Sequence, residues 1–210
     1  MRAVLEHPFR AATLSLLACA LAALLLHGDG VEGLQALARY TGRAGFLWFA
    51  LVFSISPWAR LAPGDLARAA LRARRGLGLA FGYHHFVHLA ALLVYLRASG
   101  HELNAGRAAG GMVGYAVLAL MMATSSDAAV RRLGPANWRR LHRAGLWYLW
   151  IVFLLTYLPR LLGKVPDAGG GPVEFTLAVA LLAAILGLRV AAWRFARRLA
   201  VEKLAAAGKH

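Results

Sequence analysis

The chain has 210 residues, 60% of them hydrophobic, and it carries a formal net charge of +15. Soluble domains are about 45–50% apolar, so this composition excludes an ordinary water-soluble fold. The charge does not indicate a nucleic-acid-binding protein, because such proteins carry their basic residues on a soluble fold. One cysteine, Cys19, excludes a disulfide framework and sites built from several cysteines. Long apolar blocks separated by arginine clusters are instead typical of a multi-pass membrane protein.

Six stretches are long and apolar enough to span a bilayer, because a transmembrane helix needs about 20 mostly apolar residues. In chain order they cover roughly residues 9–27, 42–61, 76–97, 108–124, 138–162 and 172–190. The fourth is the shortest and begins with two glycines. In the first, the apolar run continues to Leu26, which favours an uncleaved span over a signal peptide. We therefore predict an all-α bundle of six transmembrane helices that forms a single domain over residues 1–210.

Lysine and arginine are distributed unevenly between the connecting segments. With six spans, the N-terminus, segments 60–75 and 125–143, and the C-terminal tail share one side and hold 18 of the 24 basic residues. Basic residues accumulate in cytoplasmic loops, so we expect both termini in the cytoplasm. The basic tail, about residues 193–210, acts as the stop signal of the last span or as a helix end on anionic headgroups; we favour the stop signal.

Four histidines lie within the predicted spans, where ionisable side chains usually mark a site. His84, His85 and His88 belong to the third span, and His142 lies near the start of the fifth. His84 and His88 are four residues apart and share a helical face, whereas His85 points about 100° away from His84. No Asp or Glu occupies the interior of a span, which argues against an ion-coupled transporter. Haem needs only one or two axial imidazoles and an apolar slot between helices, so these histidines are candidate haem ligands.

His88 and His142 lie at different depths. His88 follows Arg75 by 13 residues, about 20 Å along a helix, whereas His142 lies among arginines near the cytoplasmic end of its span. If both are ligands, they mark two haem levels, and each needs another partner. Arg74, Arg75 and the arginines around His142 suit haem propionates or lipid phosphates.

The same residues have simpler interpretations. His142 could be an interfacial residue without a ligand role, and the three histidines of the third span could be interhelical hydrogen-bonding groups. Glycines at 76, 78 and 82 on that span are compatible with a flat macrocycle or with a closely packed helix, and the sequence does not choose between them.

Three segments carry a family resemblance: TGRAGFLWFALVFSISPWARL (41–61), RRGLGLAFGYHHFVHL (74–89) and TSSDAAVRRLGPANWRRLHRAGLWYLW (124–150). Together they resemble the ferric reductase-like transmembrane domain. Within it, they are most similar to the haem-binding membrane subunit of the bacterial periplasmic methionine-sulfoxide reductase system. The likeness covers roughly residues 41–162.

The resemblance implies a six-helix bundle in the bacterial inner membrane that holds b-type haem and passes electrons to an acceptor outside. The family's histidines in the third span and at the start of the fifth match His88 and His142, and a possible second ligand position matches Arg74. The family has another histidine 13 or 14 residues after the one at His142, but here those positions are Leu155 and Thr156. The haem at that level would then be five-coordinate, bound by a substitute, or absent.

We therefore predict a b-type haem electron-transfer subunit rather than a complete enzyme. It would hold one or two haems, with His88 and His142 as axial ligands and His84 as a substitute. Electrons would come from a quinol or from a separately supplied flavin reductase on the cytoplasmic side and would leave to a periplasmic partner. The alternatives are a haem-less structural or assembly membrane protein of the same fold and, less favoured, a metal-ion transporter lined by His84, His85 and His88.

Overall fold

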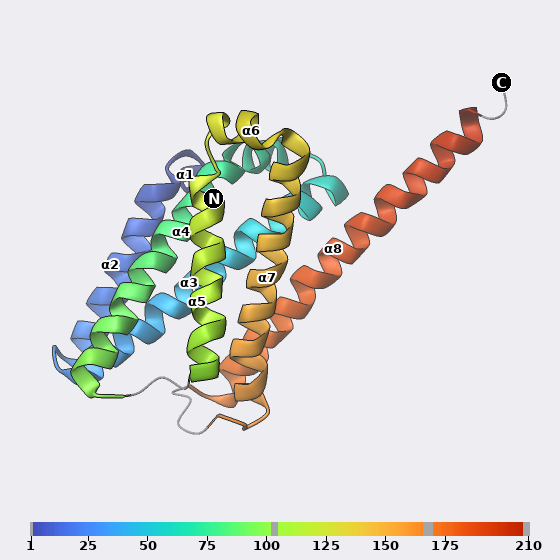
Figure 1. The fold of residues 1–210 in the computed structure, drawn as a ribbon. Helices are drawn as coiled ribbons and strands as arrows, with labels where there is room; N and C mark the ends of the chain where they lie inside the picture. Colours follow the sequence, from blue (N-terminus) through green and yellow to red (C-terminus); the bar gives the residue numbers. More distant parts are fainter. Residues whose placement is uncertain (1, 102–104, 166–169, 208–210) are drawn as a thin grey trace.

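The computed structural model describes residues 2–101, 105–165 and 170–207, and within them the regular structure is entirely α-helical. The all-α prediction is therefore confirmed. The helices are α1 (Arg2–Glu6), α2 (Pro8–His27), α3 (Val31–Leu61), α4 (Asp65–Ser99), α5 (Ala105–Ala123), α6 (Asp127–Leu133), α7 (Pro135–Leu161) and α8 (Pro172–Ala207) (Figure 1).

Five of these helices, α2, α3, α4, α7 and α8, are long and apolar enough to cross a membrane. A sixth span is obtained only when α5 and α6 are taken together, and these two are bent by 101° at the break between them. The chain is thus a multi-pass membrane protein with five or six candidate spans, and the count of six stays a prediction.

The helices extend beyond three of the predicted spans. Helix α3 begins at Val31 rather than near residue 42, and α4 begins at Asp65, so most of the expected 60–75 loop is helical. Helix α8 continues to Ala207 through the basic tail, whose residues 208–210 lie outside the described part of the chain. A long apolar stretch in the sequence marks only the part of a helix that lies within the hydrocarbon core of the bilayer. The flanking Ala- and Arg-rich segments are themselves good helix formers, so the helices extend beyond such stretches.

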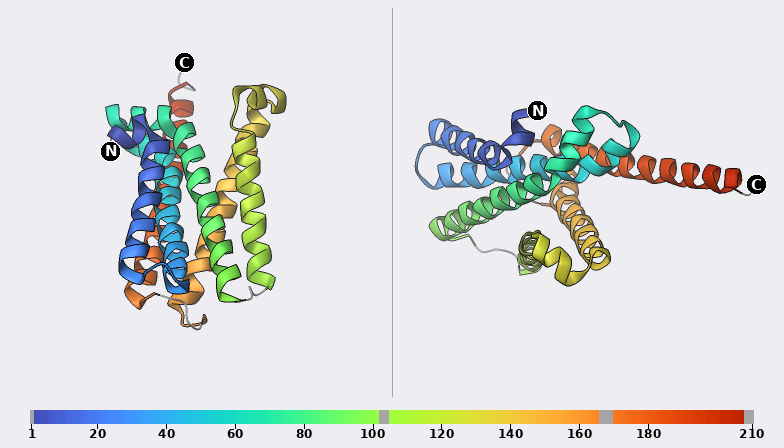
Figure 2. Two further views of the ribbon diagram at one scale, coloured as in Figure 1. Left: turned by 90° about the vertical axis from the view of Figure 1, so that its left-hand side faces the viewer. Right: turned by 90° about the horizontal axis from the view of Figure 1, so that it is seen from above.

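The helices form two groups when the bundle is viewed along its axis (Figure 2). Helices α2, α3 and α4 pack together, with the most extensive contact between α3 and α4, while α5 packs against α7. Helix α8 crosses α3 and α7 and then diverges from the bundle (Figure 1). The N-terminus and the C-terminal end of α8 lie at the same end of the bundle, which we call the termini side; the opposite end is the far side.

Aromatic rings fill the interior between α3 and α7. Phe46, Phe49 and Phe53 follow one face of α3 and are buried, as are Phe153 and Tyr157 of α7. Ring centroids lie 4.8 Å apart for Phe49 and Phe153 and 4.9 Å apart for Phe46 and Tyr157. Because lipid is as apolar as these side chains, their close packing rather than their hydrophobicity holds the helices together.

A proline in α3 creates a second interhelical contact. Pro57 has no N–H, so the carbonyl of Phe53, four residues earlier, has no partner within the helix. Arg189 of α8 donates a hydrogen bond to that carbonyl at 3.0 Å, and its guanidinium lies 3.6 Å from the centre of the Phe53 ring. The sequence places Arg189 with the basic residues at the end of the last span, whereas the structure uses it as a half-buried link between α3 and α8.

Candidate functional site

The three histidines of α4 point in two directions. His84 is fully buried, and its Nε2 lies 3.3 Å from the Ser15 hydroxyl of α2. His88 contacts Thr41 of α3. His85 points toward α5 and α7, where its ring stacks on Tyr115 with 5.2 Å between the centroids. The shared face of His84 and His88 thus meets α2 and α3, and His85 faces the second group of helices.

Hydrogen bonds around Thr41 determine which nitrogen of His88 carries the proton. The Thr41 hydroxyl donates to the carbonyl of Leu37 at 2.7 Å, with the Ala38 carbonyl at 3.2 Å. Its oxygen lies 3.1 Å from His88 Nδ1, and because its hydrogen is already used, it accepts from that nitrogen. Neutral His88 therefore carries its proton on Nδ1 and has a lone pair on Nε2, the arrangement of a metal-binding imidazole oriented by a second residue.

His85 is not among the haem ligands predicted from the sequence. Its Nδ1 is buried and has no hydrogen-bond partner, and its ring lies 5.3 Å from that of His88 and 5.7 Å from that of Phe153. A buried nitrogen without a partner is costly. This imidazole, in an apolar setting between α4, α5 and α7, is therefore a further candidate ligand. In the sequence, only the offset of about 100° between His85 and His84 indicated that His85 faces different helices from His84.

Two glycines of α3 make room for these rings. A Cβ added at Gly42 would lie 3.0 Å from His88 Cε1, and one added at Gly45 would lie 2.8 Å from His85 Nδ1. Gly82 of α4 has a different neighbour, Met122 of α5, while Gly78 faces open space. The glycines that clear space for the histidines are therefore on α3, and Gly82 serves close helix packing.

We expect Gly45→Ala to displace the His85 ring and to lower haem occupancy, because its Cβ contact is shorter than side chains normally allow. Gly78→Ala is the matched control, since nothing lies within 4 Å of an added Cβ there. Haem per protein, measured by pyridine haemochrome after purification, checks this prediction. Equal haem content in the two variants would contradict it.

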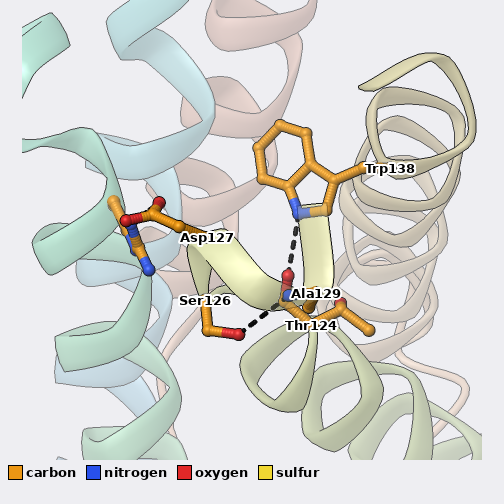
Figure 3. Close-up of polar contacts among 6 residues, drawn as sticks. Thr124, Ser126, Asp127, Ala129 and Trp138 are labelled. Atoms are coloured by element: carbon orange, nitrogen blue, oxygen red, sulfur yellow. Dashed lines mark hydrogen bonds and ion pairs between the residues drawn. The ribbon is translucent and has the colours of Figure 1, made fainter. Parts of the chain in front are cut away.

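His142 lies at a bend between α5, α6 and α7. Its Nε2 is 3.2 Å from the Thr124 hydroxyl, which itself donates to the Leu120 carbonyl at 2.7 Å, so His142 Nε2 carries the hydrogen. The ring of Trp138 lies against that of His142 in a tilted arrangement, with 4.2 Å between the centroids. Trp138 also donates through Nε1 to the Thr124 carbonyl at 2.8 Å (Figure 3). In this arrangement His142 links α5 to α7. Its role as an axial ligand stays a prediction.

The neighbouring residues stabilise the same bend. Ser126 accepts a hydrogen bond from the Ala129 N–H at 3.1 Å and caps α6 (Figure 3). Asp127, in the first turn of α6, accepts from Arg75 of α4 at 2.7 Å. Arg74 and Arg75 are both exposed. The structure therefore places Arg75 in an ion pair on the termini side, about 20 Å along α4 from His88.

Helix α7 offers no imidazole opposite His88 among its described residues. Leu155, at one family histidine position, is 65% exposed and points away from the bundle. Thr156 donates to the Val152 carbonyl at 2.8 Å, and buried Tyr157 packs on Phe46. The α7 side chain that meets α4 is therefore aromatic: Phe153 lies against His85, while Tyr157 packs on α3.

A small slot lies between α2, α3 and α4. Its volume is about 270 Å³, and its polar groups are the hydroxyls of Thr13, Tyr83 and Thr41. Thr13 donates to the Tyr83 hydroxyl at 3.5 Å. Since Thr41 also accepts from His88, one wall of the slot is hydrogen-bonded to a candidate haem ligand.

The described residues fit haem on one side only. His88 would offer an Nε2 lone pair and His85 has an unpartnered nitrogen. Gly42 and Gly45 let α3 pack directly against the two imidazole rings, His88 Nε2 included, so they accommodate the rings themselves. At the depth of His88, the opposite helix α7 supplies aromatic rings and no imidazole among its described residues; its histidine, His142, lies near the termini side. In the described part of the chain, no three His, Cys, Asp or Glu side chains converge on a possible metal site.

A curated relative is similar over most of its length. The chain is 30% identical over 179 residues to the protein-methionine-sulfoxide reductase heme-binding subunit MsrQ of Ralstonia nicotianae, an alignment covering 82% of this chain and 78% of the relative. The chain belongs to the MsrQ family. This confirms the resemblance predicted from the sequence. No family model matches this MsrQ-family chain, and no solved structure does so either.

Proposed function

We propose that this MsrQ-family chain is a membrane-embedded b-type haem subunit that passes electrons to a periplasmic partner that reduces methionine sulfoxide. The contact between the Thr41 oxygen and His88 Nδ1, 3.1 Å long, is the observation that carries this proposal. With the Thr41 hydrogen donated to the Leu37 carbonyl, we place the imidazole proton on Nδ1, which leaves the lone pair on Nε2 for iron. The similar MsrQ protein is named as the heme-binding subunit of a protein-methionine-sulfoxide reductase, which supports both haem binding and a role in methionine-sulfoxide reduction for this chain.

The distribution of basic residues supports the orientation of the chain in the membrane. Of the 24 Lys and Arg residues, 18 belong to the N-terminus, segments 60–75 and 125–143, and the C-terminal segment from Arg189 onward. By the positive-inside rule, the termini side faces the cytoplasm, and the far side faces the periplasm of an inner membrane. In this orientation electrons would leave at the far side, to a periplasmic partner.

His88 is the primary candidate ligand, with His85 beside it, and His142 marks a possible second haem near the termini side. Bound haem supplies the one-electron chemistry, while the chain supplies ligation, burial and orientation. Thr41 fixes the His88 tautomer, the glycines of α3 leave space, and Tyr115 and Phe153 keep the site apolar. Arg74 and Arg75 would neutralise only the propionates of a haem at the level of His142, on the termini side, because both arginines lie far from His88.

The slot between α2, α3 and α4 supports a quinol as donor, since it combines apolar walls with three hydroxyl groups. We expect Ala20→Phe, which fills this slot from an exposed position, to slow haem reduction by a soluble quinol at least tenfold. Ala18→Phe is the control, because Ala18 is also exposed on α2 but does not line the slot. Stopped-flow absorbance measures the rate. Equal rates in both variants would indicate another donor, such as a separately supplied flavin reductase.

A reduced-minus-oxidised visible spectrum of the purified protein tests the haem proposal itself. We expect a b-type α-band from protein produced with ample haem. A colourless but folded preparation would contradict the proposal. The missing imidazole at Leu155 and Thr156 would then favour the haem-less structural or assembly protein.

A further inference from the structure

A long open groove runs along α8 where this helix diverges from the end of α3 (Figure 1). Its volume is about 720 Å³. Most of its lining is apolar or small, and two arginines lie toward the end of α8. The lining residues are Leu61, Ala183, Leu186, Gly187, Val190, Ala191, Arg194, Phe195 and Arg198.

The apolar part of the groove has the length of one membrane leaflet. From Ala183 to Arg194 there are 11 residues, about 16 Å along a helix. Half the hydrocarbon core of a bilayer is about 15 Å. With the first arginine at the headgroup level, Ala183 lies near the bilayer centre. The groove therefore follows the path of an acyl chain from the headgroups to the midplane.

The polar end of the groove is cationic. Arg194 and Arg198 are four residues apart, so their side chains lie on the same face of α8. Both are exposed, and neither takes part in the ion pairs between described residues. No acidic residue lines the groove; Glu202, one turn beyond Arg198, is the nearest acid along α8 and is exposed. This charge is complementary to a phosphate.

We propose that the groove binds one acyl chain of an anionic phospholipid, with the phosphate between Arg194 and Arg198. The acyl chain fills the space that α3 and α8 leave between them as they separate. Arg189 links α8 to α3 about one turn before the arginine pair, and the lipid extends this contact to the membrane surface. This inference is independent of haem, because none of the lining residues contacts the candidate haem site.

Retention of phosphatidylglycerol tests the role of the arginines. The full-length protein is reconstituted with phosphatidylcholine alone or with added phosphatidylglycerol, extracted in mild detergent, and analysed by native mass spectrometry. We expect Arg194→Gln and Arg198→Gln, made one at a time, each to weaken phosphatidylglycerol binding about fivefold, given the attraction of one basic residue to an anionic membrane. Arg197→Gln is the matched control, because Arg197 stacks over Trp193 at 4.9 Å and does not line the groove.

A steric pair of variants tests the place of binding without changing charge. Gly187→Leu fills the groove, and nothing lies within 4 Å of an added Cβ, so the helix tolerates it. Ala184→Leu is the control, because Ala184 is exposed on α8 but does not line the groove. We expect Gly187→Leu to lose the bound lipid and Ala184→Leu to retain it.

Two outcomes would overturn the proposal. One is an equal loss of lipid in the Arg197 control, which would indicate general attraction to the charged tail. The other is unchanged lipid in Gly187→Leu accompanied by altered cross-linking between copies, which would identify the groove as a protein interface. Circular dichroism confirms that each variant is folded, so either result is decisive.

Discussion

His88→Ala should yield protein without the b-type α-band of the haem at the level of His88, whereas His84→Ala should retain that band. The reason is the hydrogen bonding of the two rings. His88 Nδ1 donates to Thr41 and leaves the lone pair on Nε2, whereas His84 Nε2 is already used by Ser15 of α2 and only its buried Nδ1 has no partner. Difference spectra and haem quantification of the purified variants measure this effect. Loss of the band in His84→Ala with retention in His88→Ala would reverse the assignment.

Substitutions at Thr41 distinguish a specific loss of haem ligation by His88 from a general loss of structure. Thr41→Val removes the acceptor of His88 Nδ1, and losing such a supporting partner typically costs 10–100-fold in metal affinity, so we expect about this loss for haem. Thr41→Ser keeps the hydroxyl and should restore binding and the midpoint potential. Haem titration of the apoprotein and redox titration of the haem-bound form report the two quantities. If serine and valine behave alike, the hydroxyl does not orient His88.

Arg189→Met should lower the free energy of unfolding by about 1–3 kcal/mol, because it leaves the buried Phe53 carbonyl without a donor. That carbonyl depends on Arg189 only because Pro57 has no N–H to offer it. Unfolding in mixed detergent and SDS, followed by circular dichroism, measures the change. Arg197→Met is a matched control on the same helix, since Arg197 is exposed and lies outside the lipid groove.

The double variant Arg189→Met/Pro57→Ala should recover most of the lost stability. Alanine at position 57 restores the N–H that bonds the Phe53 carbonyl within α3, so the arginine is no longer required there. The two substitutions are therefore expected to be strongly non-additive. Additive losses would show that the cation–π contact with Phe53, rather than the carbonyl bond, is what Arg189 contributes.

The sequence by itself determined the membrane character, the approximate spans and the family. These depend on local quantities: a span needs a certain length of apolar residues, and motif spacing is read directly from the chain. It also singled out the histidines, because ionisable residues are rare within spans. The helix ends at Val31, Asp65 and Ala207 were missed, since a helix continues into the headgroup region where hydropathy no longer reports it.

Only the tertiary structure decided which way each side chain faces. Periodicity places His85 about 100° from His84, but the rotation of α4 against its neighbours determines that His84 meets α2 and His85 meets α5 and α7. The link between Arg189 and Phe53 joins residues 136 positions apart. Likewise, the clearance provided by Gly42 and Gly45 exists only where α3 approaches α4. Such contacts arise from the packing of whole helices, and the spacing of residues within one helix does not encode them.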